Sequence, residues 1–326
     1  LDTSRKVIKI AILGDSTTQF LNKAIKAQGR LAGWEFEIWE AEFGQIERQV
    51  FDPGSDLYAF EADFVVIAFT AKKQIAKFYG SSAAAQAHFA VEKAGHFGDL
   101  VETLTAQSKA KILLFNFEEI DDQVFGQFSN KHRGAWLNQV RRLNVALMDL
   151  AEVHGNVFLV DIASLHNRLG RATAFAPNIY VSTDLVHSLD FTATIAKYVT
   201  DIVSAILGKF KKCLILDLDN TTWGGIIGDD GIENIEVGNL GIGKVFVELQ
   251  RWAKALKERG IILAVCSKNN EATAKEPFEK HPDMVLRLDD IAVFVANWDN
   301  KADNIRHIQE ILNIGIDSLV FLDDNP

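Results

Sequence analysis

The sequence predicts an α/β protein built from two doubly wound parallel-sheet domains. The chain has 326 residues, of which 48% are apolar, and this length exceeds that of a usual single domain. Short apolar runs alternate with amphipathic helical stretches, an order that produces a parallel sheet covered by helices on both faces. The same strand-then-helix pattern starts again at Lys212. We therefore expect one domain over residues 1–208 and a second over residues 209–326.

Five apolar runs in the first domain have the length and composition of strands. They cover residues 7–13, 34–39, 64–69, 112–117 and 157–160. Helical spacing predicts a helix directly after the first strand and further helices over residues 84–106, 135–153 and 191–207. Ligands of such sheets lie at the carboxyl ends of the strands, so the residues that follow each strand are the first candidates for a site.

The second domain repeats this pattern over a shorter length. Apolar runs predict strands at residues 214–216, 261–265 and 318–322, and helical spacing predicts helices at residues 245–256 and 301–312. Residues 224–238 contain five glycines and alternate apolar with polar side chains, a pattern that predicts a β-hairpin flap rather than a folded cap. A doubly wound domain would normally continue with another helix and strand, so we expect the natural protein to extend beyond Pro326, which leaves this domain incomplete at its C-terminal end.

Composition and charge argue against several classes of function. The chain has 34 Lys and Arg against 44 Asp and Glu, a formal net charge of -10, and no basic stripe, so nucleic acid is not an expected partner. Apolar stretches are too short to cross a bilayer, and the N-terminus lacks a secretory signal pattern. Cys213 and Cys266 lie in apolar runs, which indicates buried thiols in a reducing compartment. We therefore expect a soluble, cytoplasmic protein without a membrane partner.

Two aspartates follow the strand at residues 214–216. Asp217 and Asp219 are separated by one residue, so they can share a face, or share one metal ion and one substrate where the chain bends away. The alternative interpretation is a solvated turn, because Asp and Asn are common turn formers. Three later strand or helix ends add further polar side chains, namely Ser267, Lys301 and the pair Asp323 and Asp324.

In this order the polar residues resemble the four motifs of the haloacid dehalogenase (HAD) superfamily. These motifs are Asp-x-Asp-x-Thr, Ser, Lys and Asp-Asp, and the first ends here at Thr221. Longer segments are similar to the FkbH-like family, HAD subclass IIIC, which implies a cap-less Rossmann-like domain. They are LDLDNTTWGG from Leu216, VCSKN from Val265, Asn297-Trp298 ahead of Lys301, and FLDDNP from Phe321. Thr222 departs from this family, in which leucine is expected.

The resemblance implies a magnesium-dependent phosphatase or phosphotransferase that works through an aspartyl-phosphate. Asp217 would be the nucleophile and a metal ligand. Asp219 would act as acid and then as base, with its backbone carbonyl near the metal. Asp324 would complete the metal site, with Asp323 in a supporting or shared role. Oxygen ligands of this kind suit Mg²⁺.

Three further residues would bind the phosphoryl group in this interpretation. Thr221 and Ser267 would hold its oxygens through hydroxyl and backbone donors, and Lys301 would pair with the phosphate and with the nucleophile. The intervals between the motifs leave no room for an extra folded cap. The site is therefore expected to be open, and to be covered by the first domain or by a carrier protein.

The family resemblance also implies a finer function. FkbH-like proteins are linked to taking a glyceryl unit from a phosphorylated three-carbon acid, removing its phosphate and loading it on acyl carrier protein. A phosphorylated small molecule is thus the expected substrate and acyl carrier protein a candidate partner. Cys266, next to Ser267, is a candidate thioester carrier, and the alternative is a small buried hydrophobic residue.

The first domain carries a second candidate site. Ser16 follows the first strand in a Gly-Asp-Ser sequence, and Asp184 lies three residues before His187, which together form the nucleophile, acid and base set of a hydrolase triad. These residues resemble the SGNH (GDSL-type) hydrolases, a fold that often precedes the HAD domain in FkbH-like proteins, and Gly44 could stand for the oxyanion glycine of that family. The asparagine of that family has no counterpart after the third strand.

Three classes of function therefore stay open. The first is the HAD-type phosphatase described above. The second is an SGNH-type esterase or acyltransferase with an auxiliary HAD domain, and a catalytically silent SGNH-like domain is the alternative to it. The third is a non-enzymatic scaffold or carrier-binding module, which is disfavoured because no structural need brings a lysine and several carboxylates together.

Overall fold

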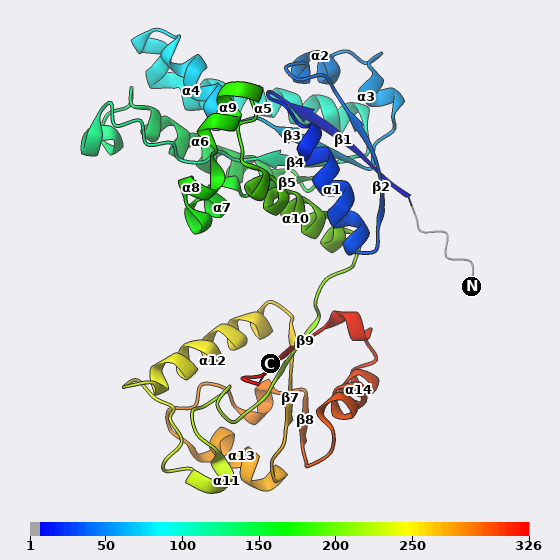
Figure 1. Cartoon of the computed structure of the whole chain (residues 1–326), viewed down its shortest axis with the longest axis vertical. Coiled ribbons are helices and arrows are strands. Elements are labelled where there is room, and N and C mark those ends of the chain that lie inside the picture. Colours follow the sequence, from blue (N-terminus) through cyan, green and yellow to red (C-terminus); the bar gives the residue numbers. More distant parts are fainter. Residues whose placement is uncertain (1–6, 326) are drawn as a thin grey trace. The chain divides into compact units, whose positions relative to one another are not determined.

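The computed structural model describes residues 7–325 of the chain, which forms two compact units (Figure 1). Unit 1 spans Leu1–Leu207 and unit 2 spans Gly208–Pro326. Each unit contains one sheet, and every strand pair of the described residues is parallel. The predicted α/β fold class with two parallel sheets is confirmed. In the described part of the chain, no helix combines the length and the apolar character that crossing a membrane would require.

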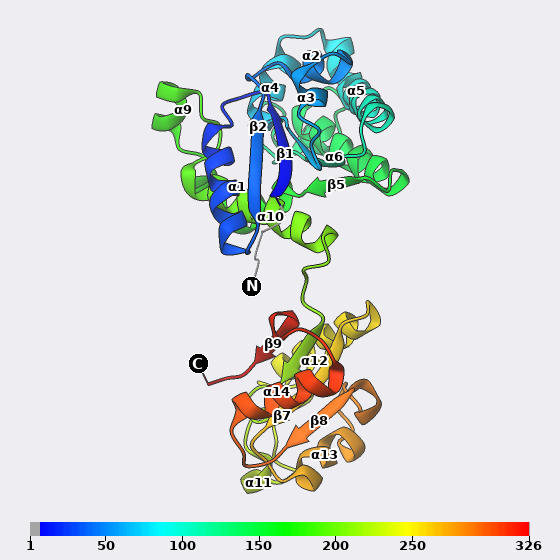
Figure 2. The same ribbon diagram turned by 90° about the vertical axis from the view of Figure 1, so that its right-hand side faces the viewer.

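The sheet of unit 1 has five strands in the order β2-β1-β3-β4-β5. The strands are β1 (Val7–Gly14), β2 (Glu35–Glu40), β3 (Phe64–Ala68), β4 (Lys111–Phe115) and β5 (Val157–Val160). Strands β1 and β2 run side by side in Figure 2, and Gly14 at the end of β1 pairs with Ala68 at the end of β3. All five residues of β3 are buried, as expected for a central strand covered on both faces.

Helices cover both faces of this sheet. One core packs β-strand residues such as Leu13 against α2 (Ile46–Phe51), α3 (Asp56–Ala59), α4 (Ala71–Tyr79), α5 (Ala83–Gln107) and α6 (Trp136–Val153). The opposite core packs residues such as Ile12 against α1 (Gln19–Leu31), α7 (Ile162–Leu169), α8 (Arg171–Ala174) and α10 (Leu189–Ile206). Since neighbours along a strand point to opposite faces, the apolar run of β1 supplies both cores. The remaining elements of unit 1 are η1 (Gly126–Asn130) and α9 (Pro177–Thr183).

The sheet of unit 2 has four strands in the order β8-β7-β6-β9. The strands are β6 (Cys213–Leu216), β7 (Ile262–Ser267), β8 (Val293–Ala296) and β9 (Leu319–Leu322). One face packs against α12 (Gly243–Glu258) and α13 (Glu271–Lys280), and the other against α14 (Lys301–Leu312). Short elements complete the unit, namely α11 (Ile227–Asp230), η2 (Leu288–Asp290) and η3 (Ile316–Ser318).

Capping side chains set where two helices of unit 2 begin. Asn270 accepts hydrogen bonds from the backbone N–H groups of Ala272 and Thr273 at the start of α13, and Asn300 accepts one from Ala302 at the start of α14. Such caps satisfy N–H groups that have no partner inside the helix. The cap at Asn300 makes Lys301 the first residue of α14, at the same edge of the sheet as the ends of β6 and β7.

The predicted β-hairpin flap at residues 224–238 is wrong. This segment contains the short helix α11, and a single antiparallel bridge between Gly224 and Glu236 closes it. Asp230 explains the difference, because its carboxylate accepts a hydrogen bond from the backbone N–H of Ile226 at 2.7 Å and bends the chain into a helical turn. The segment is a loop and not a folded cap.

The fourth strand of unit 1 ends two residues earlier than its apolar run predicts. The backbone N–H of Phe117 donates to the side-chain oxygen of Asn144, and the side-chain amide of Asn144 donates to the carbonyl oxygen of Phe117, at 2.9 and 2.7 Å. This pair of hydrogen bonds takes the place of ladder bonds and carries the chain out of the sheet after Phe115.

The close contact at Gly14 generates a stability prediction. A Cβ atom at this position would lie 2.4 Å from Cγ2 of Thr18, and Thr18 is held by a 2.5 Å hydrogen bond to Glu40. We expect Gly14→Ala to lower the free energy of unfolding by about 1–3 kcal/mol through overpacking, measured by urea unfolding followed by circular dichroism.

Gly95→Ala is the matched control. Gly95 lies inside α5, and a Cβ atom added there would meet open space, so alanine should stabilise the helix by up to about 1 kcal/mol. Equal effects of the two substitutions would contradict a steric role for Gly14.

Candidate functional site

Polar residues from three strands of unit 2 line one cavity of about 640 Å³. Asp217 and Asp219 follow β6, Ser267 ends β7, and Asp323 follows β9. Lys301, the first residue of α14, lines the same cavity. The carboxyl ends of parallel strands meet at one edge of the sheet, which is why residues so distant in sequence converge here.

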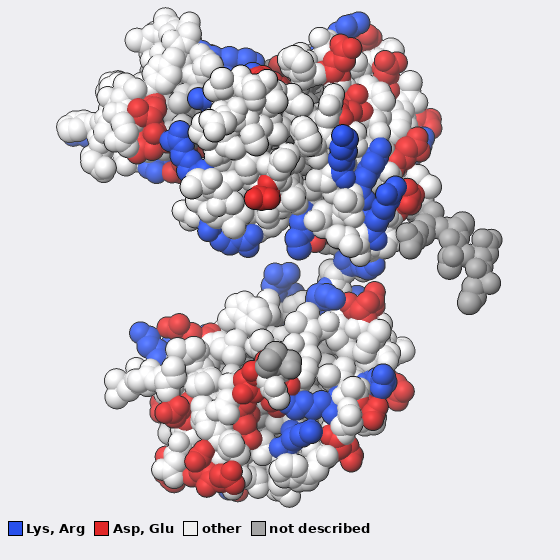
Figure 3. Space-filling view, in the orientation of Figure 1, with Lys and Arg blue, Asp and Glu red and all other residues white. Residues whose placement is uncertain are grey.

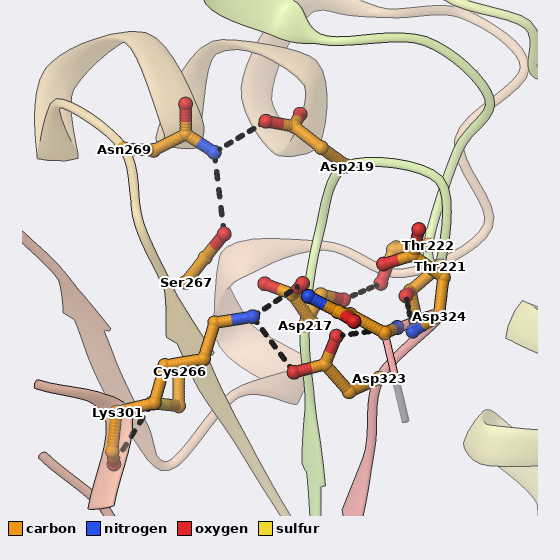
Figure 4. A network of polar contacts seen from close by, with 11 residues as sticks. Asp217, Asp219, Thr221, Thr222, Cys266, Ser267, Asn269, Lys301, Asp323 and Asp324 are labelled. Atoms are coloured by element: carbon orange, nitrogen blue, oxygen red, sulfur yellow. Dashed lines mark hydrogen bonds and ion pairs between the residues drawn. The ribbon is translucent and has the colours of Figure 1, made fainter.

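The Lys301 ammonium group lies between two carboxylates (Figure 4). Its Nζ is 2.9 Å from Oδ2 of Asp217 and 2.7 Å from Oδ2 of Asp323. Asp217 is 5% exposed, so this pairing compensates a carboxylate that has lost most of its water. The three side chains come from three different elements, and the contact ties α14 to the ends of β6 and β9.

The pairing changes the protonation properties of two of these groups. Burial on its own would lower the pKa of Lys301, but the hydrogen bonds to Asp323 and Asp217 outweigh it and raise that pKa above its ordinary value. Burial would likewise raise the pKa of Asp323, and the bond from Lys301 outweighs it and lowers that pKa. Both shifts favour the charged forms, so the ion pair is kept over a wide pH range around neutrality.

Asp217, Asp323 and Asp324 fit a divalent metal ion. Each offers one carboxylate oxygen, and these oxygens lie within 4.8 Å of one another. Oδ1 of Asp217 is buried and has no hydrogen-bond partner among the described residues, although buried polar atoms are normally satisfied. Asp323 uses its two oxygens to accept from Lys301 and from the backbone N–H of Asn325, which favours Asp324 over Asp323 as a ligand.

The Asp219 carboxylate is directed away from this cluster of three carboxylates. Its Oδ1 accepts hydrogen bonds from the indole N–H of Trp223 at 3.0 Å and the backbone N–H of Ile227 at 3.1 Å, and its Oδ2 accepts from the side-chain amide of Asn269 at 2.9 Å. These three donors hold the carboxylate on the Asn269 side of the cavity, where it lies apart from Lys301 (Figure 4). The side chain is thus oriented without being a member of the metal cluster.

Of the two hydroxyl groups predicted to bind phosphate, Ser267 lines the cavity, whereas Thr221 is not among the lining residues. The Thr221 hydroxyl oxygen accepts a 3.0 Å hydrogen bond from the backbone N–H of Asp324, and the Ser267 hydroxyl oxygen accepts one of 3.2 Å from Asn269. The Ser267 hydroxyl group, which lines the cavity, keeps an O–H for an incoming oxygen. Thr222, which stands where leucine is expected, donates to the backbone carbonyl of Asp217 at 2.6 Å and so helps to fix the backbone at this aspartate.

The motif pattern assigns no role to two residues of the site, Asn269 and Trp223. Asn269 is 4% exposed and bridges Ser267 and Asp219 through its side-chain amide. Trp223 is fully buried and donates to Asp219. Their place beside the motif residues is visible in the sequence. Their hydrogen-bond partners can be identified only from the folded structure.

Cys266 is buried in the core of unit 2. It is 0% exposed, and its thiol points to the backbone carbonyl of Lys301 at 3.8 Å. Desolvation raises its pKa to about 11. These properties are those of a packed, unreactive thiol, and they do not favour the thioester role.

The second candidate site is not assembled as a triad. Asp184 is in the left-handed region at φ 57° and pairs with Lys73 at 2.5 Å, and no hydrogen bond joins Asp184 to His187 among the described residues. Gly44 has φ +74°, and its backbone N–H donates to the carbonyl of Gly14 at 2.9 Å, so this N–H is already used. Ser16 is 5% exposed.

Ser16 and His187 nevertheless line one small cavity of about 30 Å³. Nε2 of His187 lies 3.6 Å from Oε1 of the buried Glu118. Burial raises the pKa of Glu118, but the interaction with His187 outweighs it and holds that pKa below the ordinary value. The imidazole therefore faces Glu118 and not Asp184, and the space beside Ser16 has room for about one water molecule.

Charge around unit 2 is mixed in sign. In Figure 3, acidic side chains gather near the middle of the face shown and lie beside basic ones. Five aspartates (Asp217, Asp219, Asp229, Asp323 and Asp324) line the described cavity, against the two lysines Lys301 and Lys268. This excess of negative charge favours binding of a further cation.

Comparison with known proteins gave one family model and several solved structures. Residues 9–204 match the model described as FkbH, N-terminal domain. The crystal structure of the N-terminal part of the protein BF1531 from Bacteroides fragilis, which contains a phosphatase domain and is complexed with Mg, is 50% identical, covers 99% of this chain and 85% of that chain, and superimposes with a TM-score of 0.94. A GDSL-like lipase from Parabacteroides merdae is 14% identical, with coverage of 60% and 96% and a TM-score of 0.38. No curated protein matches the chain.

The environment of Cys266 predicts low thiol reactivity. With a pKa of about 11, about one thiol in a thousand is ionised at pH 8, and burial blocks access. We expect the native protein to resist iodoacetamide at pH 8 for hours, and to react at both cysteines after unfolding, as measured by mass spectrometry. Rapid modification of Cys266 in the folded protein would show that the thiol is accessible and would reopen a carrier role.

Proposed function

The chain belongs to the FkbH family, and from the site in unit 2 we propose that it is a Mg²⁺-dependent hydrolase of the HAD type that removes a phosphate group. The observation that carries this proposal is the state of Asp217. One of its oxygens accepts from Lys301, while the other is buried without a hydrogen-bond partner among the described residues. A nucleophile and metal ligand has these requirements, whereas a purely structural aspartate would be satisfied on both oxygens.

Phosphate transfer would proceed in two steps. An oxygen of Asp217 attacks phosphorus while the bond to the leaving oxygen breaks, and Asp219 supplies a proton to that oxygen. Asp219 then takes a proton from water, which attacks phosphorus and releases inorganic phosphate from Asp217. Lys301, Thr221 and Ser267 hold the phosphoryl oxygens during both steps.

Magnesium fits the cluster of three carboxylates formed by Asp217, Asp323 and Asp324. Asp217 and Asp324 would hold the ion through their carboxylates and Asp219 through its backbone carbonyl, with Asp323 supporting Lys301. Bound there, Mg²⁺ would neutralise negative charge on the transferring group. The complex of the Bacteroides fragilis protein with Mg supports this choice.

The substrate proposal rests on the family. We propose a phosphorylated small molecule, with transfer of a phosphoglycerate-derived glyceryl unit to acyl carrier protein as the finer hypothesis. The buried Cys266 gives that hypothesis no thioester carrier in this chain. We also propose a cytoplasmic location, because both cysteines are free and buried.

An SGNH-type esterase or acyltransferase is less well supported. Asp184 is engaged by Lys73, the N–H of Gly44 is engaged by Gly14, and the cavity beside Ser16 measures about 30 Å³. An ester could not reach Ser16 in this arrangement. We therefore propose that unit 1 is a catalytically silent relative of these hydrolases.

Asp217→Asn tests the nucleophile. We expect the rate of phosphate release to fall by about a thousandfold or more, because the amide is a poor nucleophile, while the circular dichroism spectrum stays unchanged. Removal of Mg²⁺ with EDTA should abolish phosphate release, and added Mg²⁺ should restore it.

Asp229→Asn is a matched control. Asp229 lines the same cavity but is exposed, so this variant should retain activity within about twofold of the wild type. Normal turnover by Asp217→Asn would disprove the proposed nucleophile.

Asn269→Ala tests how Asp219 is positioned. Loss of the amide removes the donor to Oδ2 of Asp219, so kcat should fall by about ten- to a hundredfold with a smaller change in KM. An unchanged kcat would show that Trp223 and Ile227 are sufficient to orient Asp219.

A further inference from the structure

Two exposed apolar side chains line a cavity that is otherwise polar. The cavity around Asp217 is lined mainly by carboxylate, amide, hydroxyl and ammonium groups, but it also includes Trp298 and Ile226. Trp298 is 76% exposed and Ile226 is 45% exposed. Exposure of a large apolar residue is common on protein surfaces, but its place in a ligand-sized cavity is informative.

The loop that carries Trp298 is firmly braced. The side-chain amides of Asn297 and Asn304 bond to each other in both directions, at 3.2 and 2.7 Å. The backbone N–H of Asn297 donates to the carbonyl of Ser267, and its side-chain oxygen accepts from the N–H of Asp299. The indole is therefore exposed on an ordered loop, which lowers the entropy cost of binding a group against it.

This loop also sets the distance between Trp298 and the phosphate site. Lys301 follows Trp298 by three residues, so their Cα atoms lie at most about 11 Å apart. The loop after β8 carries Trp298, the loop after β6 carries Ile226, and β7 lies between these two strands. The two apolar side chains therefore belong to loops that flank the end of β7 at Ser267.

We propose that Trp298 and Ile226 form a subsite for an apolar or planar organic group attached to the phosphate of the substrate. The proposal rests on the phosphatase function of the same site and adds the chemical class of the leaving group. A cavity of about 640 Å³ lies in the range that encloses a drug-sized ligand, so it has room for more than a phosphorylated three-carbon acid. The phosphoglycerate of the finer hypothesis would leave the indole without a partner, so that hypothesis and the subsite are alternatives that the test below separates.

The test compares two phosphomonoesters on the full chain with Mg²⁺. 4-Methylumbelliferyl phosphate has a planar, apolar leaving group, and 3-phosphoglycerate has a small polar one. Trp298→Ala should raise KM for 4-methylumbelliferyl phosphate about five- to tenfold with kcat within twofold, and should leave both constants for 3-phosphoglycerate within twofold. Trp298→Phe, which keeps an aromatic face, should recover most of the loss.

Trp252→Ala provides the matched control. Trp252 is 50% exposed on α12 and does not line this cavity, so its removal should affect neither substrate. Equal changes in KM for both substrates in Trp298→Ala, or no change for either, would overturn the subsite. Turnover of 3-phosphoglycerate alone by the wild type would overturn it as well. Absence of wild-type activity on both substrates would instead count against the phosphatase function from which the subsite is inferred.

Discussion

The ammonium group of Lys301 holds the site of unit 2 together, because it is shared by carboxylates from two strands. Asp217 at the end of β6 and Asp323 after β9 would repel each other in a half-buried cavity, and a single cation between them reverses that balance. The helix cap at Asn300 fixes where α14 begins and thereby where the lysine stands. The start of α14 therefore determines how the carboxylates at this edge of the sheet are neutralised.

Much of this arrangement could be predicted because it follows from backbone topology. A continuous apolar run followed by Asp217 or Ser267 predicts a buried strand that ends in polar groups, and parallel strands bring such ends together. Lys301 at the start of a helix follows from the cap before it. The convergence of these residues on one cavity therefore needed only strand order and direction, not side-chain detail.

The choice of partners among side chains could not be predicted in the same way. Asp184 was expected to orient His187, but Lys73 from another helix competes for it and a buried Glu118 faces the imidazole instead. Asn269 could have been a surface residue after β7, and only the position of Asp219 gives its amide a partner. Neither α13 nor the strand β8 was predicted. The proline at position 277 argues against a helix interior and conceals α13 in the sequence.

Two aspartates at equivalent positions in the two units differ in how their carboxylate oxygens are hydrogen-bonded. Asp15 and Asp217 each follow the first strand of their unit, yet both oxygens of Asp15 accept hydrogen bonds from Thr70 or Gln74. One oxygen of Asp217, in contrast, has no hydrogen-bond partner in the described part of the chain. An unsatisfied buried oxygen costs stability. Selection for thermal stability alone would therefore tend to remove Asp217 while retaining Asp15, so variants that keep Asp217 under such selection would mark a selection for activity.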